Sequence, residues 1–297
     1  RSGVDTDWLK IPVRNGIGTQ QNVYIDGGSS DNVLYGLGLN YQQNSGAMKG
    51  SSRENLSVNS YLSYRVKDVR FRNELVFIFN KAVNSPYGSF RNYALMNPYW
   101  APYDEFGETK FFLENVRSPN RDVFLNSQIN PVYNTTLNTV DESKYRNFSN
   151  NFVAEWKALD WLRFTGRFSY QVQNDESDNF KPAQHTDFAT IPLERFYERG
   201  SYLKGYGRMT RMDGSVIGNV NKSYEEHVLY GSIGMNIIEN KFSEELITVQ
   251  GFPNSRLDQL LAGNRYPEGL SPTGDESISR TAGYFANGGY AYDNRYF

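Results

Sequence analysis

Apolar and polar positions alternate along Val33–Gly46, and the two sets differ sharply in character. Successive side chains of an extended strand point to opposite sides, so a period of two predicts a β-strand. The first set contains Val33, Tyr35, Leu37, Leu39 and Tyr41, and the second contains Leu34, Gly36, Gly38, Asn40 and Gln42.

The same alternation predicts about nine strands, bounded by clusters of Gly, Asn, Asp or Pro. In a soluble sandwich the apolar faces would meet a second sheet, whereas in an outer-membrane barrel they would meet lipid. The predicted strands are 20–26, 33–43, 54–66, 69–80, 147–157, 162–173, 225–237, 244–252 and 281–292.

The connections between these strands favour the barrel. Short turns are predicted at Lys67–Asp68, at ALDW before Leu162, and at ENKFS before Glu244. They alternate with long connections, so in an antiparallel meander one end carries only tight turns and the other only large loops. Outer-membrane barrels have this one-sided arrangement, with short periplasmic turns and long external loops. The long connections are 42–53, 81–146, 174–224 and 253–280.

Charges gather on one face of the predicted strands, which suits a watery or plugged lumen because charges are costly to bury in a dry core. Arg70 and Arg72 oppose the apolar side of strand 69–80, and Arg163 and Arg167 oppose that of strand 162–173. We expect all four arginines to face the lumen. The apolar sides are Val69, Phe71, Leu75, Phe77 and Phe79, and Leu162, Phe164, Phe168, Tyr170 and Val172.

Composition leaves this interpretation open and removes several others. The hydrophobic fraction is 38% and the mean hydropathy −0.64, values that a barrel with a polar lumen shares with soluble proteins. No run approaches the roughly 18 apolar residues of a membrane-spanning helix. The net charge of −2 gives no basic field for nucleic acid, and the absence of cysteine excludes disulfides and thiolate chemistry.

The sequence predicts no catalytic, metal or cofactor site, and we expect a protein that is not an enzyme. The two histidines, His185 and His227, lie far apart without a ligand pattern. The DESDN run at 175–179 clusters oxygen ligands but lacks the rest of a calcium loop, so a solvated loop is the favoured interpretation. Gly36 and Gly38 lack the third glycine and the following helix of a dinucleotide site.

Two features of the long connections have alternative interpretations. Aromatic residues crowd the stretch RNYALMNPYWAPYDEF, where they could pack the loop together or contact a ligand or partner protein. The segment 254–269 has leucines at helical spacing and predicts a loop helix that either packs over the barrel mouth or lies on the surface. The loop aromatics are Tyr93, Tyr99, Trp100, Tyr103 and Phe106.

Several ordered motifs resemble the barrel of SusC/RagA-type TonB-linked outer-membrane proteins. DTDWLK at 5–10, followed by NVYIDGGSSDNVLYGLGLNYQQNSGAMKG at 22–50, resembles the start of that barrel. ALMNPYWAPYDEFGE at 94–108 resembles a stretch of its first large loop. EWKALDWLRFTGRFSY at 155–170 resembles a strand, turn and strand, and SRTAGYFANGGYAYDNRYF at 279–297 resembles a later strand.

The resemblance implies an all-β, antiparallel transmembrane β-barrel of the 22-stranded plugged class, with nine or ten strands in this segment. Residues 1–297 would form part of the barrel domain, with the plug and the other strands outside the segment. The implied location is the bacterial outer membrane, in contact with membrane lipid and lipopolysaccharide. The implied function is import of an oligosaccharide or peptide with a SusD-like surface lipoprotein and TonB. The four lumen arginines would then pair with acidic groups on the plug.

One rival hypothesis is a secreted or surface β-protein that binds glycans without transport. A siderophore or vitamin receptor without a lipoprotein is a third, against which the family motifs argue. The chain begins without an initiator Met and stops inside a predicted strand, so we expect an internal segment of a longer protein, with any targeting sequence upstream.

Overall fold

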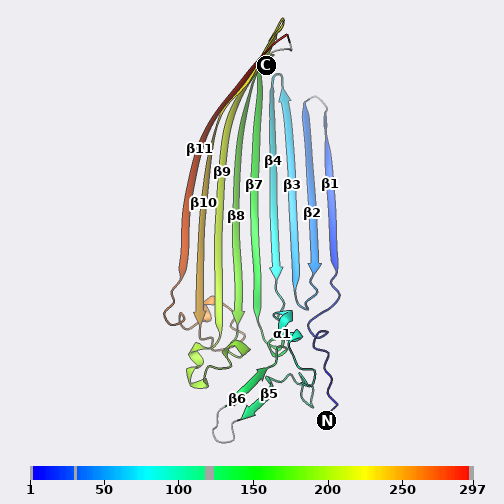
Figure 1. The fold of residues 1–297 in the computed structure, drawn as a ribbon, viewed down its shortest axis with the longest axis vertical. Helices are drawn as coiled ribbons and strands as arrows, with labels where there is room; N and C mark the ends of the chain where they lie inside the picture. Colours follow the sequence, from blue (N-terminus) through cyan, green and yellow to red (C-terminus); the bar gives the residue numbers. More distant parts are fainter. Residues whose placement is uncertain (1–2, 30–31, 118–123, 294–297) are drawn as a thin grey trace.

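The computed structural model describes residues 3–29, 32–117 and 124–293, and the described part is almost entirely β-structure (Figure 1). Short helical pieces lie in the connections: the α-helix α1 (Phe90–Ala94) and 3-10 segments at Tyr133–Thr136, Thr186–Phe188, Leu193–Glu198 and Leu260–Ala262. The strands are β1 (Gly18–Ser29), β2 (Val33–Ser45), β3 (Ser52–Val66), β4 (Val69–Val83), β5 (Phe112–Arg117), β6 (Phe124–Ile129), β7 (Val140–Leu159), β8 (Leu162–Lys181), β9 (Ser201–Tyr224), β10 (His227–Gln250) and β11 (Thr273–Tyr292).

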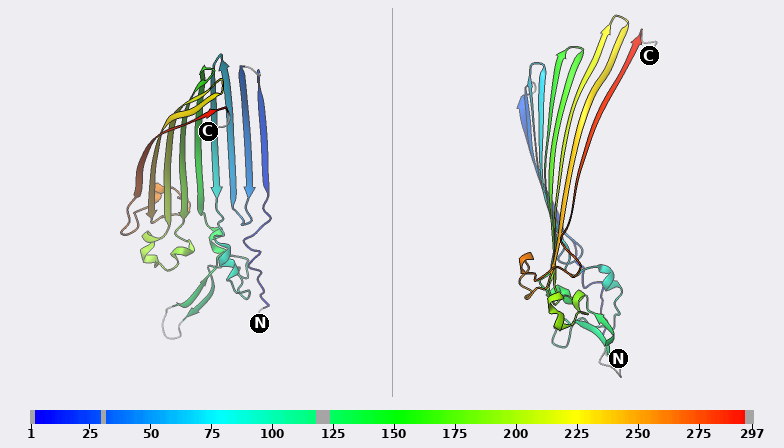
Figure 2. Two further views of the ribbon diagram at one scale, coloured as in Figure 1. Left: turned by 45° about the horizontal axis from the view of Figure 1, so that its top comes forward. Right: turned by 90° about the vertical axis from the view of Figure 1, so that its left-hand side faces the viewer.

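Nine of these strands form one antiparallel sheet, and β5 and β6 form a separate hairpin. The order in the sheet is β1-β2-β3-β4-β7-β8-β9-β10-β11. The nine strands therefore pair in chain order, and the β5–β6 hairpin lies in the connection between β4 and β7. Strands β1 and β11 are the edges, and the sheet does not close on itself. The upper ends of β9–β11 bend away from the flatter part of the sheet (Figure 2).

The predicted one-sided arrangement of connections is confirmed. Two-residue turns join β3 to β4 at Lys67–Asp68, β7 to β8 at Asp160–Trp161, and β9 to β10 at Glu225–Glu226. The long connections, including the β5–β6 hairpin, gather at the opposite end together with the N-terminal segment (Figure 1). Lys67 and Glu225 adopt left-handed φ angles of 50° and 52°, so two of the turns form without glycine.

The predicted turn at ENKFS is wrong, because β10 runs unbroken from His227 to Gln250. Glu239 in this run forms an ion pair with Arg280 of β11 at 2.5 Å and another with Lys241 of its own strand at 2.8 Å. A polar run of this kind resembles a turn in sequence. Here it is a part of the strand where an ion pair to the next strand and one within the strand replace apolar contacts.

Strand β9 lies inside the stretch predicted as the long connection 174–224. Gly214 and Gly218 occupy positions where apolar residues would otherwise repeat, so the alternation of apolar and polar residues is weak in this strand. The neighbouring strand β8 also extends to Lys181, so the DESDN run at 175–179 is a strand segment and not a loop. The number of strands in the sheet agrees with prediction, but two predicted strands are one strand and one strand was missed.

The helix predicted over 254–269 is also wrong. Only Leu260–Ala262 forms a 3-10 turn, and the rest of the segment is irregular. Leu260 and Ala262 pack on a small cluster of buried residues at the strand ends, whereas Leu261 is 93% exposed. Packing against the sheet therefore replaced the regular helix that the leucine spacing suggested.

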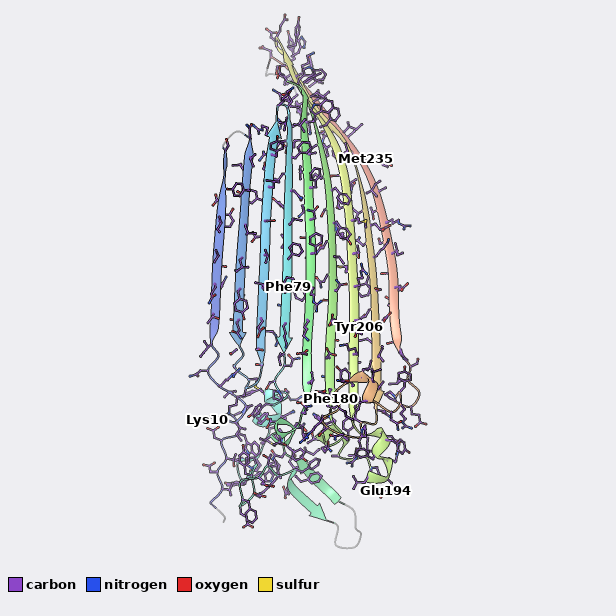
Figure 3. All side chains as sticks on the ribbon, turned by 180° about the vertical axis from the view of Figure 1, so that it is seen from behind. Lys10, Phe79, Phe180, Glu194, Tyr206 and Met235 are labelled. Atoms are coloured by element: carbon purple, nitrogen blue, oxygen red, sulfur yellow. The ribbon has the colours of Figure 1, made fainter. Side chains whose placement is uncertain are left out.

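Among the described residues, the buried large apolar side chains lie where the loops meet the strand ends, the region in which side chains crowd together in Figure 3. One cluster comprises Phe180, Tyr202, Val249 and Phe252. The other comprises Trp8, Tyr93 and Val132, with Ile11, Tyr87, Met96, Trp100 and Leu113 packed around it. The loop end is thus a packed layer, while both faces of the sheet lack a covering layer within the described residues.

Candidate functional site

One face of the sheet, which we call the aromatic face, carries a band of large apolar side chains that is interrupted by the hydrogen-bonded pair Asn73 and Asn150. The register aligns Phe77 of β4 with Phe148 of β7, Phe152 of β7 with Phe168 of β8, and Val216 of β9 with Met235 of β10. Directly paired residues point to the same side of an antiparallel sheet. Their exposed fractions range from 36% to 80% across Phe71, Phe77, Phe79, Phe152, Trp156, Phe164, Phe168, Met212, Val216, Ile233, Met235, Ile237 and Tyr284.

The opposite face, the polar face, carries the four predicted arginines. Arg70 and Arg72 on β4 are brought close to Arg163 and Arg167 on β8, because Val153 of β7 pairs with both Arg72 and Arg167. Arg70 donates to the Ser63 hydroxyl at 3.2 Å, and Arg72 forms an ion pair with Glu74. Among the described residues, Arg163 and Arg167 have no ion-pair partner.

Sequence reasoning missed two further members of this basic group. Arg65 of β3 pairs directly with Arg70, and Lys157 of β7 pairs with Arg163. Their positions next to the short turns obscured the alternation that would have assigned them to the polar face. The polar face near the short turns therefore carries a dense group of cations.

The five loop aromatics divide between the two interpretations. Tyr93 is 1% exposed and donates its hydroxyl to the Pro131 carbonyl at 3.1 Å, and burial raises the pKa of that hydroxyl well above its usual range. Trp100 is half-buried and donates to Glu114 at 3.1 Å. Tyr99, Tyr103 and Phe106 are 77%, 45% and 83% exposed. The first two residues pack the loop, and the last three are free to contact another molecule.

The N-terminal segment braces the aromatic loop. Trp8 is buried and its indole N–H donates to the Asn97 carbonyl at 2.9 Å. Thr6 donates its hydroxyl to the Trp100 carbonyl at 2.8 Å and its backbone N–H to the Pro98 carbonyl at 2.8 Å. These bonds hold the loop in one shape, so the exposed rings are presented by a rigid support.

A cavity of about 1010 Å³ lies between the strand ends and the loops that follow β4 and β8. Asn134 and Thr186 join these loops across its wall: the Asn134 amide donates to the Thr186 hydroxyl at 2.7 Å, and its oxygen accepts the Thr186 backbone N–H at 3.1 Å. The size of the cavity and its mixed lining are typical of a ligand site, and nothing in the sequence motifs indicated it.

His185 lines the same cavity, and its ring nitrogen Nδ1 accepts the backbone N–H of Asp187 at 3.1 Å. Burial lowers the pKa of His185, an effect that the nearby Asp187 opposes. Lys181 completes the group with an ion pair to Asp187 at 2.6 Å. No group of three or more His, Cys, Asp or Glu side chains that could hold a metal ion occurs in the described ranges.

Comparisons with known proteins bear on the fold. No family model matches the sequence, and a search of the curated proteins finds no match. Among solved structures, the chain resembles the RagAB peptide transporter with a TM-score of 0.76 at 15% identity, covering 98% of this chain and 32% of that one. The RagAB peptide importer in its 'closed-closed' state gives 0.77 at 16% identity, with the same coverage. The ferric preacinetobactin receptor BauA from Acinetobacter baumannii gives 0.52 at 8% identity, covering 93% of this chain and 37% of that one.

The sheet matches part of the fold of these solved structures. The chain spans about a third of the RagAB chains that it resembles. The expected likeness to SusC/RagA-type barrels is thereby confirmed at the level of the fold. The similar structures are transporters and receptors rather than enzymes. No helix of the described residues is long and apolar enough to cross a membrane.

Proposed function

We propose that this chain is part of the barrel wall of an outer-membrane, TonB-dependent importer of a bulky nutrient. The observation that carries the proposal is the aromatic face, a band of exposed rings and aliphatic chains running across the sheet. Each such side chain gains about 1.5–3 kcal/mol on leaving water, so a sheet in water would not keep the band uncovered. Lipid covers the outward-facing apolar band of transmembrane barrels.

The polar face supplies the lumen wall in this proposal. Arg163 and Arg167 have no ionic partner in the described residues, and Arg70 and Arg72 lie two strands away on the same face, with Arg65 paired to Arg70 on the strand beyond. A group of cations inside a barrel is stabilised when opposite charges face it. We therefore assign these arginines to contact with acidic groups of a plug domain outside this segment, the domain through which TonB would act.

The loop end supplies the external surface. Tyr99, Tyr103 and Phe106 project from a braced loop, which suits contact with the nutrient or with a SusD-like surface lipoprotein. The RagAB structures are described as a peptide transporter and importer, which favours a peptide over an oligosaccharide as the nutrient. This preference for a peptide is supported by the fold that the chain shares with the RagAB structures.

The experiment is uptake by a strain that lacks the gene, complemented with the intact gene or with a Y99A/F106A variant. We expect a labelled peptide mixture to enter only the complemented cells, and only when TonB is present. The double variant should reduce uptake while the protein still fractionates with the outer membrane. A Y93F variant is the control, since it keeps the buried ring and removes only an internal hydrogen bond.

One result would contradict the proposed importer, and another would change only its nutrient. Recovery of the native protein in a soluble fraction would reject the importer and favour the glycan-binding surface protein. Equal uptake of peptides with and without the gene, together with loss of oligosaccharide uptake in the deletion strain, would show that the importer carries an oligosaccharide and not a peptide.

A further inference from the structure

Polar side chains border the apolar band of the aromatic face toward the long loops. On each strand of the sheet, the residue on that face next to the band is polar or charged, and on β10 and β11 the apolar Ile247 and Ile278 lie farther out on the same face. Successive positions on one face lie about 6–7 Å apart along a strand. A stepped row of polar side chains therefore follows the edge of the band. The row consists of Gln21, Gln43, Glu54, Lys81, Arg146, Asn174, Thr210, Glu239 and Arg280. On β9, Arg208 is the next residue beyond Thr210 on the same face.

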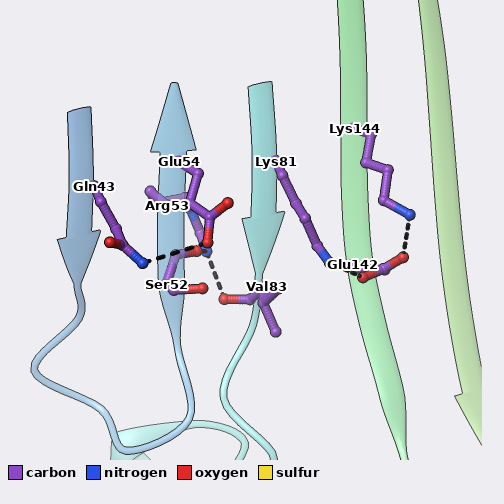
Figure 4. A network of polar contacts seen from close by, with 8 residues as sticks. All are labelled: Gln43, Ser52, Arg53, Glu54, Lys81, Val83, Glu142 and Lys144. Carbon is purple, nitrogen blue, oxygen red and sulfur yellow. Dashed lines mark hydrogen bonds and ion pairs between the residues drawn. The ribbon is translucent and has the colours of Figure 1, made fainter. Parts of the chain in front are cut away.

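Most charges near this edge are already paired within the chain. Lys81 reaches Glu142 at 3.0 Å, and Lys144 reaches the same carboxylate at 2.5 Å (Figure 4). Glu54 accepts a long hydrogen bond of 3.5 Å from Gln43 (Figure 4). Arg280 is paired with Glu239 farther along the row. These contacts satisfy the paired side chains without any other molecule.

Arg146 and Arg208 differ from these residues. Both are exposed, and in the part of the chain that the structure describes neither forms an ion pair or a side-chain hydrogen bond. The register pairs Asn174 of β8 with Arg146 on one side and with Arg208 on the other. The two guanidinium groups therefore project from alternate strands, whose backbones lie about 10 Å apart, on either side of an amide.

These residues line a shallow depression of about 330 Å³ on the sheet. Tyr206 lies one row farther from the band, and Glu176 and Glu245 pair with it on either side. The depression thus has a basic edge next to the apolar band and an acidic edge away from it. A lipid whose acyl chains cover the band would bring its headgroup phosphate to the basic edge first.

We propose that Arg146, Asn174 and Arg208 form a binding site for the phosphate of a phosphorylated lipid in the outer leaflet. The site rests on the proposed function, because it requires the aromatic face to meet lipid. Arginine suits this role, since its planar guanidinium donates paired hydrogen bonds to phosphate oxygens. The Asn174 amide lies between the two arginines and provides a further donor.

The test uses the full-length protein in nanodiscs that contain lipid A with its phosphates, or lipid A from which they have been removed. Native mass spectrometry would count the lipid retained by the wild type, by R146Q/R208Q and by R91Q/R256Q. The last variant removes two positive charges from exposed loop arginines and is the matched control. We expect R146Q/R208Q to weaken retention of phosphorylated lipid A by about tenfold or more, with the control unchanged.

Equal retention by both variants, in a protein that still folds in the outer membrane, would overturn the lipid site and leave the proposed function standing. Inorganic phosphate binding to the arginine pair without preference for phosphorylated lipid would also overturn it. Failure of the intact protein to fractionate with the outer membrane would instead reject the proposed function.

Discussion

At the residue scale, glycines on the polar face make room for large rings on the next strand. An added Cβ at Gly234 of β10 would lie 2.6 Å from the Phe285 ring of β11, and Tyr61 lies against Gly36 in the same way. The sequence around Gly36 and Gly38 lacks the third glycine and the helix of a dinucleotide site. Only the register reveals which ring uses the space that Gly36 leaves.

We predict that Gly234→Val destabilises the folded full-length protein by about 1–3 kcal/mol, because the side chain overlaps the Phe285 ring. Gly166→Val is the control, since no atom lies within 4 Å of an added Cβ there and the residue is on the aromatic face. The measurement is the temperature at which heat-modifiable migration on a gel is lost. Equal midpoints for the two variants would contradict the prediction.

His185 gives the loop junction a pH dependence. Burial places its pKa below the ordinary 6.5, so below that pH the unfolded loop binds more protons than the folded one. The stability of the junction should therefore be complete above about pH 6.5 and fall as the pH drops toward the lowered pKa. Protonation of Nδ1 also removes the acceptor for the Asp187 backbone N–H.

Hydrogen exchange of residues 182–200 checks this prediction. We expect faster exchange at pH 5.5 than at pH 7.5 in the wild type, after correction for intrinsic rates. His185→Gln should show little difference between the two conditions. A wild-type loop that exchanges equally at both values would reject a role for this histidine.

At the element scale, the strands behave as two-faced elements whose faces tolerate different substitutions. Leu37 and Leu34 lie on the same strand, β2, but Leu37 pairs with Ile25 on the aromatic face and Leu34 with Ser63 on the polar face. Leu37 also lies midway along the apolar set of its strand. The pair therefore compares the two environments with one residue type.

We expect Leu37→Lys to weaken barrel assembly by about 2–4 kcal/mol, the cost of a cation at the bilayer midplane. Leu34→Lys should assemble nearly as well as the wild type, since its side chain would face water or a polar plug. The measurement is the fraction folded in lipid vesicles over a denaturant series. A larger effect at Leu34 would reverse the assignment of the faces.

The strand predictions succeeded where the apolar band crosses the strand and failed where the strand leaves it. Strands at 33–43 and 69–80 were found because apolar residues repeat through them. The segment ENKFS at 239–243 was interpreted as a turn, because it is polar and a single strand shows no sign of the ion pair that Glu239 forms with Arg280 of the next strand. Glycines weakened the signal of β9 for a different reason, since they leave gaps in the apolar set.

At the scale of the whole molecule, the sheet of the described residues is open. Its edges are β1 and β11, and within the described residues the two apolar clusters lie at the loop end. Lipid cannot satisfy open backbone hydrogen-bonding groups.

Residues 1–297 alone should therefore not insert stably into vesicles. We expect the isolated chain to remain protease-sensitive and to show no heat-modifiable band, whereas the full-length protein shows both protection and the band. Protected, heat-modifiable insertion of the isolated chain would show that the edges find partners, for example in a second copy.

The sequence by itself determined the all-β class, the alternation of faces, the one-sided loops and the polar-face positions of Arg70, Arg72, Arg163 and Arg167. These properties are local, because the period of two and the turn residues are visible within a few positions. Only the tertiary structure decided that Tyr93 and Trp100 pack while Tyr99 and Phe106 are exposed, and that Arg146 and Arg208 share one row. Those outcomes depend on contacts between residues far apart in the chain, such as Trp8 with Asn97, which no local pattern contains.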